Sequence, residues 1–170
     1  MQEIRLTPTS YIVLGLLELA GESTPYGLKQ LVAASVGHFW TLQHAQLYTE
    51  TERLAAAGYV TEQRESGGRR RRLYALTDRG REALVAWRDD PGSERAELRE
   101  PSLLKLFFGA DAGRLAEVQL PAHRQKLAEY EAIRDGMPGE VPDGPRQALD
   151  MGIRHEREFV RFWKQVLGSP

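Results

Sequence analysis

The sequence predicts a mainly α-helical fold with one small β-hairpin, in which a compact N-terminal domain is followed by an arm of longer helices. Apolar residues recur at helical spacing along most of the chain. A glycine-rich turn between two short strand-like runs, within residues 60–76, predicts the hairpin. A chain of 170 residues suits one small domain with a helical appendage. We therefore expect an N-terminal domain over residues 1–90 and a helical region over residues 91–170.

An apolar run and a capping signal indicate the first two helices. Residues 11–20 are mostly apolar and follow Ser10, which we expect to cap the first helix. The run is too short to span a bilayer and lacks the basic flank of a signal peptide, so no membrane association is expected. Thr24 is the expected cap of a second helix, and Pro25 at its first position loses no hydrogen bond there.

A third helix follows near residue 42, and its two faces differ in chemistry. Leu47, Thr51 and Leu54 share one face, which we expect to pack on the first two helices. The opposite face is small and polar, which suits entry into a DNA major groove because glutamine can pair with adenine. An ordinary solvated face is the alternative, since Glu50 and Glu52 on this helix oppose phosphate. The polar face carries Ala45, Gln46, Thr49, Glu52 and Arg53, with Tyr48 on its flank.

An arginine-bearing hairpin is expected next. Residues 60–64 and 71–76 are strand-like and flank a turn at 65–68, after which four arginines stand in a row at 69–72. Glu62 and Glu65 can neutralise part of this charge across the hairpin. Four like charges repel one another, and contact with phosphate is the simplest compensating gain. A helix followed by a basic hairpin is the order of a winged helix-turn-helix, whose helix enters the major groove while its wing reaches the backbone.

The rest of the chain reads as four further helices. Thr77 is the expected cap of a fourth helix that ends near residue 89. A polar connector follows, and then helices are expected at 101–108, from Asp111 to about residue 135, and from about residue 145 to the end. The last helix carries a heptad-like apolar stripe, which requires a partner surface.

That partner is either the preceding helix or a second copy of the chain. We expect a homodimer, because a two-helix arm has two apolar faces and because two-fold protein symmetry matches two DNA half-sites. The fold expected overall is an N-terminal winged helix-turn-helix with a C-terminal α-helical dimerisation arm. The expected dimer contacts are Leu127, Tyr130, Leu149, Ile153, Val160, Trp163 and Leu167.

Several short motifs resemble the PadR family of bacterial transcriptional regulators, in the branch with a long helical C-terminal region. They are Tyr-Ile-Val-Leu-Gly-Leu-Leu at 11–17, Pro-Tyr-Gly-Leu at 25–28, Gln-Leu-Tyr at 46–48, Arg-Leu at 53–54, Gly-Tyr-Val at 58–60 and Tyr-Ala-Leu-Thr-Asp-Arg-Gly at 74–80. The resemblance continues more loosely through Trp87, residues 103–108 and the last helix. It implies a dimeric winged-helix repressor on an inverted-repeat operator. Thr51 departs from the leucine usual in the family, which suggests weaker packing under the third helix.

The residues expected at the DNA come from the second helix, the third helix with its preceding turn, and the wing. They are Tyr26, Thr41, Gln43, His44, Ala45, Gln46, Tyr48, Thr49, Arg53, Gly67, Gly68, Arg69, Arg70, Arg71 and Arg72. Members of the family commonly release DNA when a small aromatic or lipophilic effector binds. Trp87, Phe159 and Trp163 are candidates for such a pocket, with a plain core role as the alternative for each.

The composition argues against other classes of protein. The four histidines are scattered, there is no metal-ligand spacing, and no glycine-rich phosphate loop occurs, so neither an enzyme nor a cofactor is expected. The absence of cysteine fits a reducing cytoplasm. Basic and acidic residues number 23 and 24, so any affinity for nucleic acid must come from a local patch. Two alternatives stay open: a MarR-type regulator, and a winged helix whose arginines bind an acidic protein.

Overall fold

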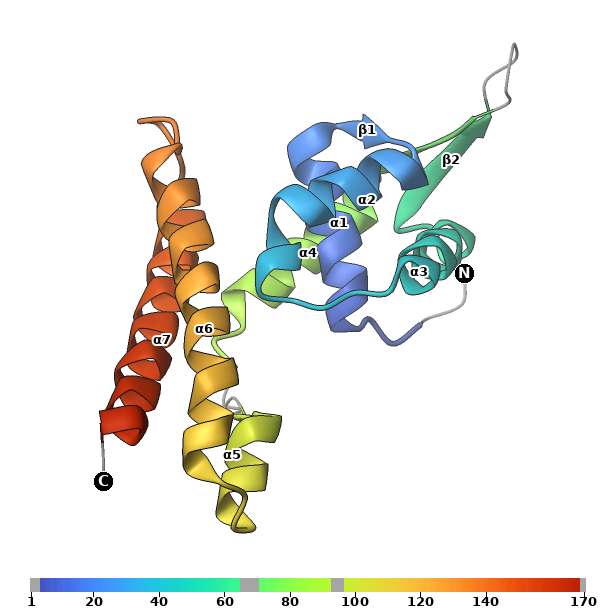
Figure 1. The fold of residues 1–170 in the computed structure, drawn as a ribbon. Coiled ribbons are helices and arrows are strands. Elements are labelled where there is room, and N and C mark those ends of the chain that lie inside the picture. The colour runs from blue at the N-terminus through green and yellow to red at the C-terminus, as the bar shows by residue number, and fades with distance from the viewer. Residues whose placement is uncertain (1–3, 65–70, 93–96, 169–170) are drawn as a thin grey trace. The chain divides into compact units, whose positions relative to one another are not determined.

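The computed structural model describes residues 4–64, 71–92 and 97–168 of the chain. The chain divides into two compact units, Met1–Glu94 and Arg95–Pro170, and each has a hydrophobic core of its own. Helices make up most of both units, and the sheet found among the described residues has three short strands (Figure 1). The mainly α-helical fold with a small hairpin is therefore confirmed.

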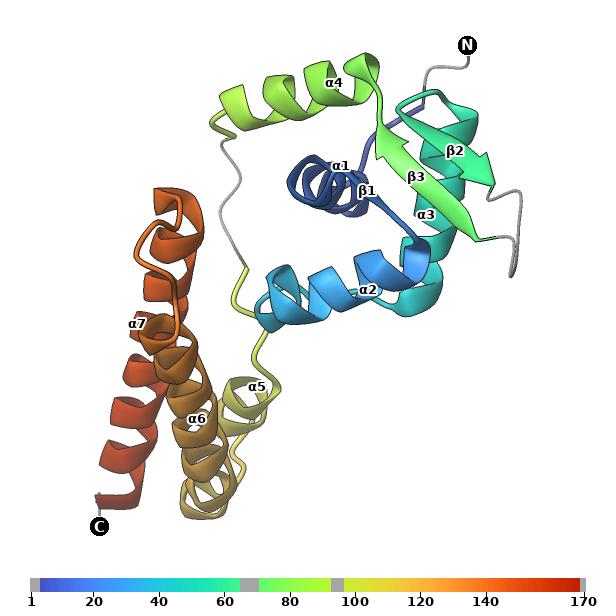
Figure 2. The same cartoon turned by 90° about the horizontal axis from the view of Figure 1, so that it is seen from above.

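The first unit has the element order of a winged helix-turn-helix. Helices α2 and α3 form the helix-turn-helix pair, and the β2–β3 hairpin is the wing. Figure 2 looks along α1 and shows α2, α3 and α4 arranged around it. The elements are α1 (Pro8–Ala20), β1 (Glu22–Ser23), α2 (Pro25–Ala34), the 3-10 helix η1 (Val36–His38), α3 (His44–Ala56), β2 (Val60–Arg64), β3 (Arg72–Leu76) and α4 (Asp78–Asp89).

Helix α1 begins earlier than the sequence analysis expects, and Ser10 is not its cap. Thr7 is the N-cap residue, and Pro8 occupies the first helical position. The Thr7 amide donates to Ser10 Oγ at 2.7 Å, while the Ser10 amide donates to Thr7 Oγ1 at 3.4 Å, which makes a reciprocal capping box. Ser10 is instead a buried residue of the first turn.

The caps expected for α2 and α4 are confirmed. The Thr24 hydroxyl accepts a hydrogen bond from the Gly27 amide at 3.0 Å, and Thr77 accepts one from the Gly80 amide at 3.1 Å. Each threonine satisfies a helix N-terminal amide that otherwise has no partner within its helix.

The sheet contains the expected hairpin and one strand that the sequence analysis missed. Strands β2 and β3 pair antiparallel, with Arg64 directly opposite Arg72. The short strand β1 adds to the other side of β3, with Glu22 opposite Ala75, so the order is β1-β3-β2. Two residues are too few to show the alternation by which a strand is recognised in a sequence.

The inner face of α3 packs as expected, including the unusual threonine. Leu47, Thr51 and Leu54 are all buried in the core of the first unit. The hydroxyl of Thr51 donates to the carbonyl oxygen of Leu47 at 2.8 Å, so the buried polar group has a partner. Threonine is accommodated here because the helix itself accepts its hydrogen bond.

The second unit is built on two long helices, α6 (Ala112–Asp135) and α7 (Asp143–Gly168), that pack side by side along most of their length (Figure 1). Helix α5 (Pro101–Phe107) packs against α6. Asp111 caps α6 as expected, and α6 is assigned as continuous helix through Pro121. The core of this unit is formed by Ala116, Leu120, Phe159, Val160 and Trp163.

Most of the apolar stripe of α7 packs within its own chain. Of the seven expected dimer contacts, which lie on α6 and α7, four are buried inside the second unit, and the part that the seven play in a dimer stays a prediction. Helical spacing shows that a stripe needs a partner, but it does not show whether the partner belongs to the same chain. Tyr130, Ile153, Val160 and Trp163 are buried, Leu127 and Leu149 are partly buried, and Leu167 is exposed.

Candidate nucleic-acid interface

The outer face of α3 presents the small and polar side chains that the sequence analysis expects at the DNA. The helix begins after Gln43. The backbone N–H of Gln43 donates to Gln46 Oε1 at 3.3 Å. This bond engages one end of the Gln46 amide group and orients it at the first turn of the helix. The exposed residues are Gln43, His44, Ala45, Gln46, Tyr48 and Thr49, together with Thr41 in the preceding turn.

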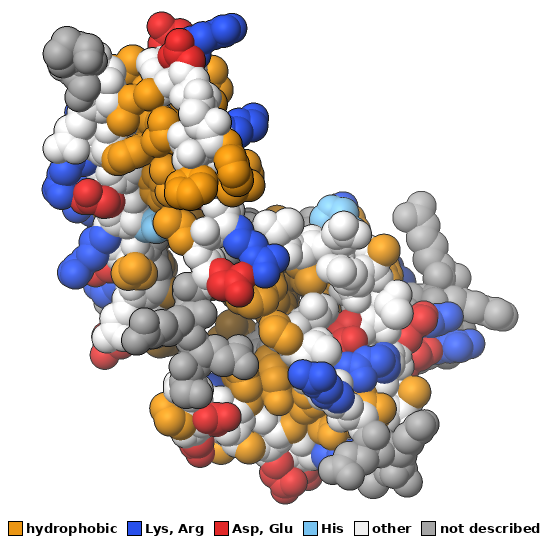
Figure 3. All heavy atoms as spheres, turned by 90° about the horizontal axis from the view of Figure 1, so that it is seen from below, with side chains coloured by type: hydrophobic (Ala, Val, Ile, Leu, Met, Phe, Trp, Pro, Cys, Tyr) orange, Lys and Arg blue, Asp and Glu red, His pale blue; other side chains and the backbone are white. Residues whose placement is uncertain are grey.

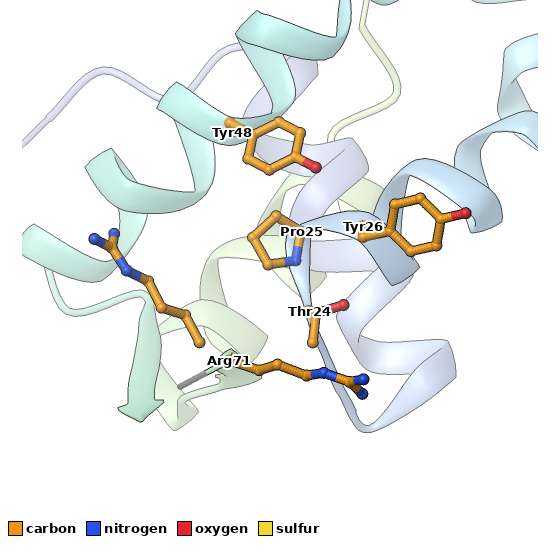
Figure 4. Close-up of a pocket in the computed structure, with 6 residues that line it drawn as sticks. Thr24, Pro25, Tyr26, Tyr48 and Arg71 are labelled. Carbon is orange, nitrogen blue, oxygen red and sulfur yellow. The ribbon is translucent and has the colours of Figure 1, made fainter. Parts of the chain in front are cut away.

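A shallow hollow of about 510 Å³ lies between the start of α2, the exposed face of α3 and the root of the wing. Figure 4 shows Tyr48 of α3 near Pro25 of α2, with Tyr26 beside it and Arg71 below Thr24. A smaller hollow shares Pro25 and Tyr48 with the first. Aromatic rings, a helix N-terminus and an arginine are groups that contact sugar and phosphate in protein–DNA complexes.

The predicted DNA residue Arg53 is committed to partners within the protein. Its Nε donates to Glu50 Oε2 at 2.8 Å, and its Nη2 donates to Glu50 Oε1 at 2.6 Å. The same Nη2 lies 3.1 Å from both the Arg5 carbonyl oxygen and Ser10 Oγ. Arg53 therefore ties α3 to α1, and the prediction that it contacts DNA is not supported by its position.

Glu50, which the sequence analysis placed against phosphate, is buried instead. Its carboxylate also accepts a hydrogen bond from the Ser10 hydroxyl. Burial alone would raise the pKa of Glu50, but the hydrogen bonds from Arg53 and Ser10 and the charge of Arg53 outweigh it and lower the pKa below its ordinary value. Glu50 thus stays charged without presenting a negative charge to DNA.

The wing carries arginines with and without protein partners. Arg71 is exposed, and among the described residues it has no ion-pair partner. Arg72 lies between two carboxylates, with Nη1 2.6 Å from Glu52 Oε1 and Nε 3.7 Å from Glu62 Oε1. The predicted DNA residues Gly67, Gly68, Arg69 and Arg70 lie outside the described residues.

Glu62 neutralises part of the arginine charge across the hairpin, as predicted. Across the hairpin, the Arg72 Nε lies 3.7 Å from Glu62 Oε1. Arg64, on the same strand as Glu62, donates its Nε–H to the same oxygen at 3.1 Å. This hydrogen bond, with a further one from the Tyr74 hydroxyl and the charges of Arg72 and Arg64, lowers the pKa of Glu62 although burial opposes the shift. The predicted partner Glu65 lies outside the described residues.

Glu52 was expected only to oppose phosphate, and its ion pair with Arg72 is the contact at this surface that sequence reasoning missed. Its pairing with Arg72 joins α3 to the wing across 20 residues of sequence. No spacing rule connects a helix residue with a strand residue at that distance, so the pattern offers no signal for the pair.

The three aromatic candidates for an effector pocket belong to different units. Trp87 is half-exposed and stacks on Tyr11 in the first unit, with ring centroids 4.6 Å apart and planes inclined by 10°. Phe159 and Trp163 belong to the core of the second unit, and Phe159 stacks on His123 at 4.4 Å. Phe159 and Trp163 therefore serve as core residues, and the effector pocket remains a prediction.

The second unit also exposes a large apolar surface. Hydrophobic side chains gather on the face of this unit that Figure 3 displays. At the end of α5, Leu104, Phe107 and Phe108 are 60%, 82% and 77% exposed. Apolar side chains this exposed commonly mark a surface that another protein covers.

The described part of the chain contains no cluster of three or more potential metal ligands from His, Cys, Asp or Glu. Within the same residues, no helix is both long enough and apolar enough to cross a membrane.

Comparison with known proteins identifies relatives along nearly the whole chain. Residues 13–86 match the sequence profile described as the transcriptional regulator PadR-like family, and residues 98–168 match that described as virulence activator alpha C-term. The negative transcriptional regulator PadR of Bacillus subtilis (strain 168) is 28% identical over 174 residues, which cover 92% of this chain and 94% of that protein.

Two solved structures of Bacillus subtilis PadR have the same fold. The complex with operator DNA superposes with a TM-score of 0.83 at 24% identity, covering 98% of this chain and 99% of that chain. The complex with p-coumaric acid gives a TM-score of 0.77 at 25% identity, covering 94% of this chain and 96% of that chain.

Proposed function

The chain belongs to the PadR-like family of transcriptional regulators, and from this membership we propose that it is a sequence-specific DNA-binding repressor. It acts in the cytoplasm as a homodimer on an inverted-repeat operator, and a small effector releases it. The family is one of regulators, in agreement with the prediction that the chain is not an enzyme.

The observation that carries the proposal is the joint presentation of α3 and the wing by one compact unit. The helix exposes Gln46, Tyr48 and Thr49, and Arg71 lies beside the same hollow as Tyr48. Amide and hydroxyl groups suit base edges, while arginine suits phosphate. The Bacillus subtilis relative, which forms a complex with operator DNA, supports the same use of this surface.

The apolar end of α5 supports a homodimer. Most of the α7 stripe is satisfied within the chain, whereas Leu104, Phe107 and Phe108 form an exposed apolar group at the end of α5. Leu98, Val118, Met151 and Leu167 are exposed in the same unit. A second copy of the chain is the partner proposed for them, because a two-fold dimer presents two copies of α3 to two half-sites.

A small aromatic compound is the proposed effector class. The support is the complex of the Bacillus subtilis regulator with p-coumaric acid. The half-exposed Trp87, stacked on Tyr11, offers an aromatic surface in the first unit. Aromatic side chains provide large apolar contact with a polar edge, which suits phenolic compounds.

The experiment that tests the function is selection of the preferred duplex from a random DNA pool by the purified protein. Binding to the selected duplex and to random duplex is then compared at two salt concentrations. We expect a preferred inverted repeat, bound far more tightly than random DNA, and its release by planar aromatic acids. Equal or absent binding to both duplexes would overturn the proposal in favour of an acidic protein partner for the wing.

A further inference from the structure

Glu52 and Arg72 link the third turn of α3 directly to the first residue of strand β3. Arg72 Nη1 lies 2.6 Å from Glu52 Oε1. Arg72 borders both hollows at this surface, and Glu52 borders the smaller one, where Pro25 and Tyr48 also lie. The pair therefore joins the helix that reads DNA with the root of the wing.

Arg72 is held from more than one direction. Its Nε faces Glu62 at 3.7 Å, and Glu62 is itself held by the Arg64 Nε at 3.1 Å. Arg64 and Arg72 stand directly opposite each other in the β2–β3 ladder, where two like charges would repel without the carboxylate between them. Two glutamates thus fix the position of one guanidinium.

The neighbouring Arg71 differs, because it has no ion-pair partner among the residues that the structure describes. Of the two hollows at this surface, Arg71 lines the larger one, whereas Arg72, the first residue of β3, lines both. If Arg72 left Glu52 to meet a phosphate, the Glu52 carboxylate would face the DNA without compensation. While the ion pair is intact, Arg72 neutralises the Glu52 carboxylate that would otherwise face the DNA.

We propose that Arg72 is a positioning residue rather than a phosphate anchor. Glu52 and Arg72 form a strut that fixes the wing on α3 and remains closed on DNA, while Arg71 supplies charge to the backbone. The inference rests on the proposed DNA-binding function and names the residues that set the geometry of that site. The strut fixes the distance between α3, which reads the bases, and the wing, which contacts the DNA backbone. It therefore contributes to discrimination between DNA sequences.

The test is a double-mutant cycle of Glu52→Gln, Arg72→Gln and the double variant, with Arg71→Gln as the matched control. Three properties are measured in the full chain: the ratio of affinities for selected and random duplex, the slope of log affinity against log salt, and amide hydrogen exchange in β2 and β3 without DNA.

We expect Glu52→Gln and Arg72→Gln each to lower the affinity ratio by roughly 3- to 10-fold, as for exposed ion pairs present twice in a dimer. The double variant should be no worse than either single variant. Arg72→Gln should leave the salt slope unchanged, whereas Arg71→Gln should reduce its magnitude by roughly 0.9 per chain. Exchange in the hairpin should rise in both strut variants and stay unchanged in Arg71→Gln.

The opposite pattern overturns the inference. If Arg72 anchors a phosphate, Arg72→Gln should reduce the magnitude of the salt slope as Arg71→Gln does. Glu52→Gln should then strengthen binding to both the selected and the random duplex. Unchanged hairpin exchange in both strut variants would also refute the strut. If the wild-type chain selects no DNA, the proposed function fails, whereas the exchange measurement still decides whether the strut exists.

Discussion

Glu50 and Arg53 form a two-bond ion pair on α3, with Arg53 Nε 2.8 Å from Glu50 Oε2 and Arg53 Nη2 2.6 Å from Glu50 Oε1. The side chain of Glu50 is 11% exposed and that of Arg53 is 33% exposed. The buried hydroxyl of Ser10 completes the cluster from α1. The pair therefore fixes α3 against α1 and leaves the outer face of α3 free for DNA.

Replacing Glu50 by glutamine should destabilise the first unit. The amide keeps the size of the side chain but lacks the negative charge of the carboxylate, which accepts hydrogen bonds from Arg53 and Ser10. Hydrogen bonds to charged groups contribute about 1.5–3 kcal/mol, and we expect the free energy of unfolding to fall by about that amount. Urea unfolding followed by circular dichroism measures it. The control is Glu82→Gln, because Glu82 is exposed on α4 and has no hydrogen-bond or ion-pair partner among the described residues.

The stabilisation by Glu50 should disappear in acid. The pKa of Glu50 in the folded protein lies below its ordinary value of 4.5. A lowered folded pKa stabilises the protein fully above the unfolded pKa, and this contribution is lost as the pH falls through the folded value. The difference in unfolding free energy between the wild type and Glu50→Gln should therefore be constant near neutral pH and shrink below about pH 4.5. If the difference in unfolding free energy instead grew in acid, the pKa of Glu50 would be raised by folding and not lowered.

The local parts of this fold were predictable, and the links between distant segments were not. Thr24 and Thr77 were recognised as caps because each acts on an amide three residues away. Ser10 was misread as a cap although Thr7-Pro8 offers the same local signal as Thr24-Pro25. Its hydrogen bond to Glu50, 40 residues further along the chain, had no local signal. Helical spacing assigned Arg53 to the outer face, but a long side chain can reach back to a buried neighbour, which spacing does not show.

Gly80 is expected to tolerate no side chain. A Cβ atom there would lie 2.2 Å from the Tyr59 carbonyl oxygen and 2.8 Å from Leu76 Cδ1. Because the first contact is with backbone, Gly80→Ala should destabilise the protein by about 1–3 kcal/mol, as overpacked cores do. Thermal unfolding measures the effect. In Gly15→Ala, the matched control in α1, the new Cβ meets nothing within 4 Å, so a gain of about 0.5–1 kcal/mol is expected.

The end of α5 should control the oligomeric state. Phe107 and Phe108 pack edge to face, with ring centroids 5.2 Å apart, and both are largely exposed. Substituting both by serine should shift the chain towards monomer in sedimentation velocity while its helical circular dichroism is retained. Leu19→Ser is the control, since Leu19 is equally exposed on α1 in the other unit. A double serine variant that sediments as the wild type does would remove α5 from the interface.

The affinity for DNA should depend steeply on salt, although the chain as a whole is nearly neutral. The 23 basic and 24 acidic residues cancel globally, so any counterion release must come from a local group of arginines. The partners of Arg64 and Arg72 are carboxylates of the wing and of α3, which leaves Arg71 as the described wing arginine able to meet phosphate without breaking an ion pair. If the arginines at 69, 70 and 71 let each of two wings neutralise two to three phosphates, the slope of log affinity against log salt should be roughly −4 to −5. Fluorescence anisotropy with labelled duplex measures the slope, and a value near zero would exclude the wing as an anchor.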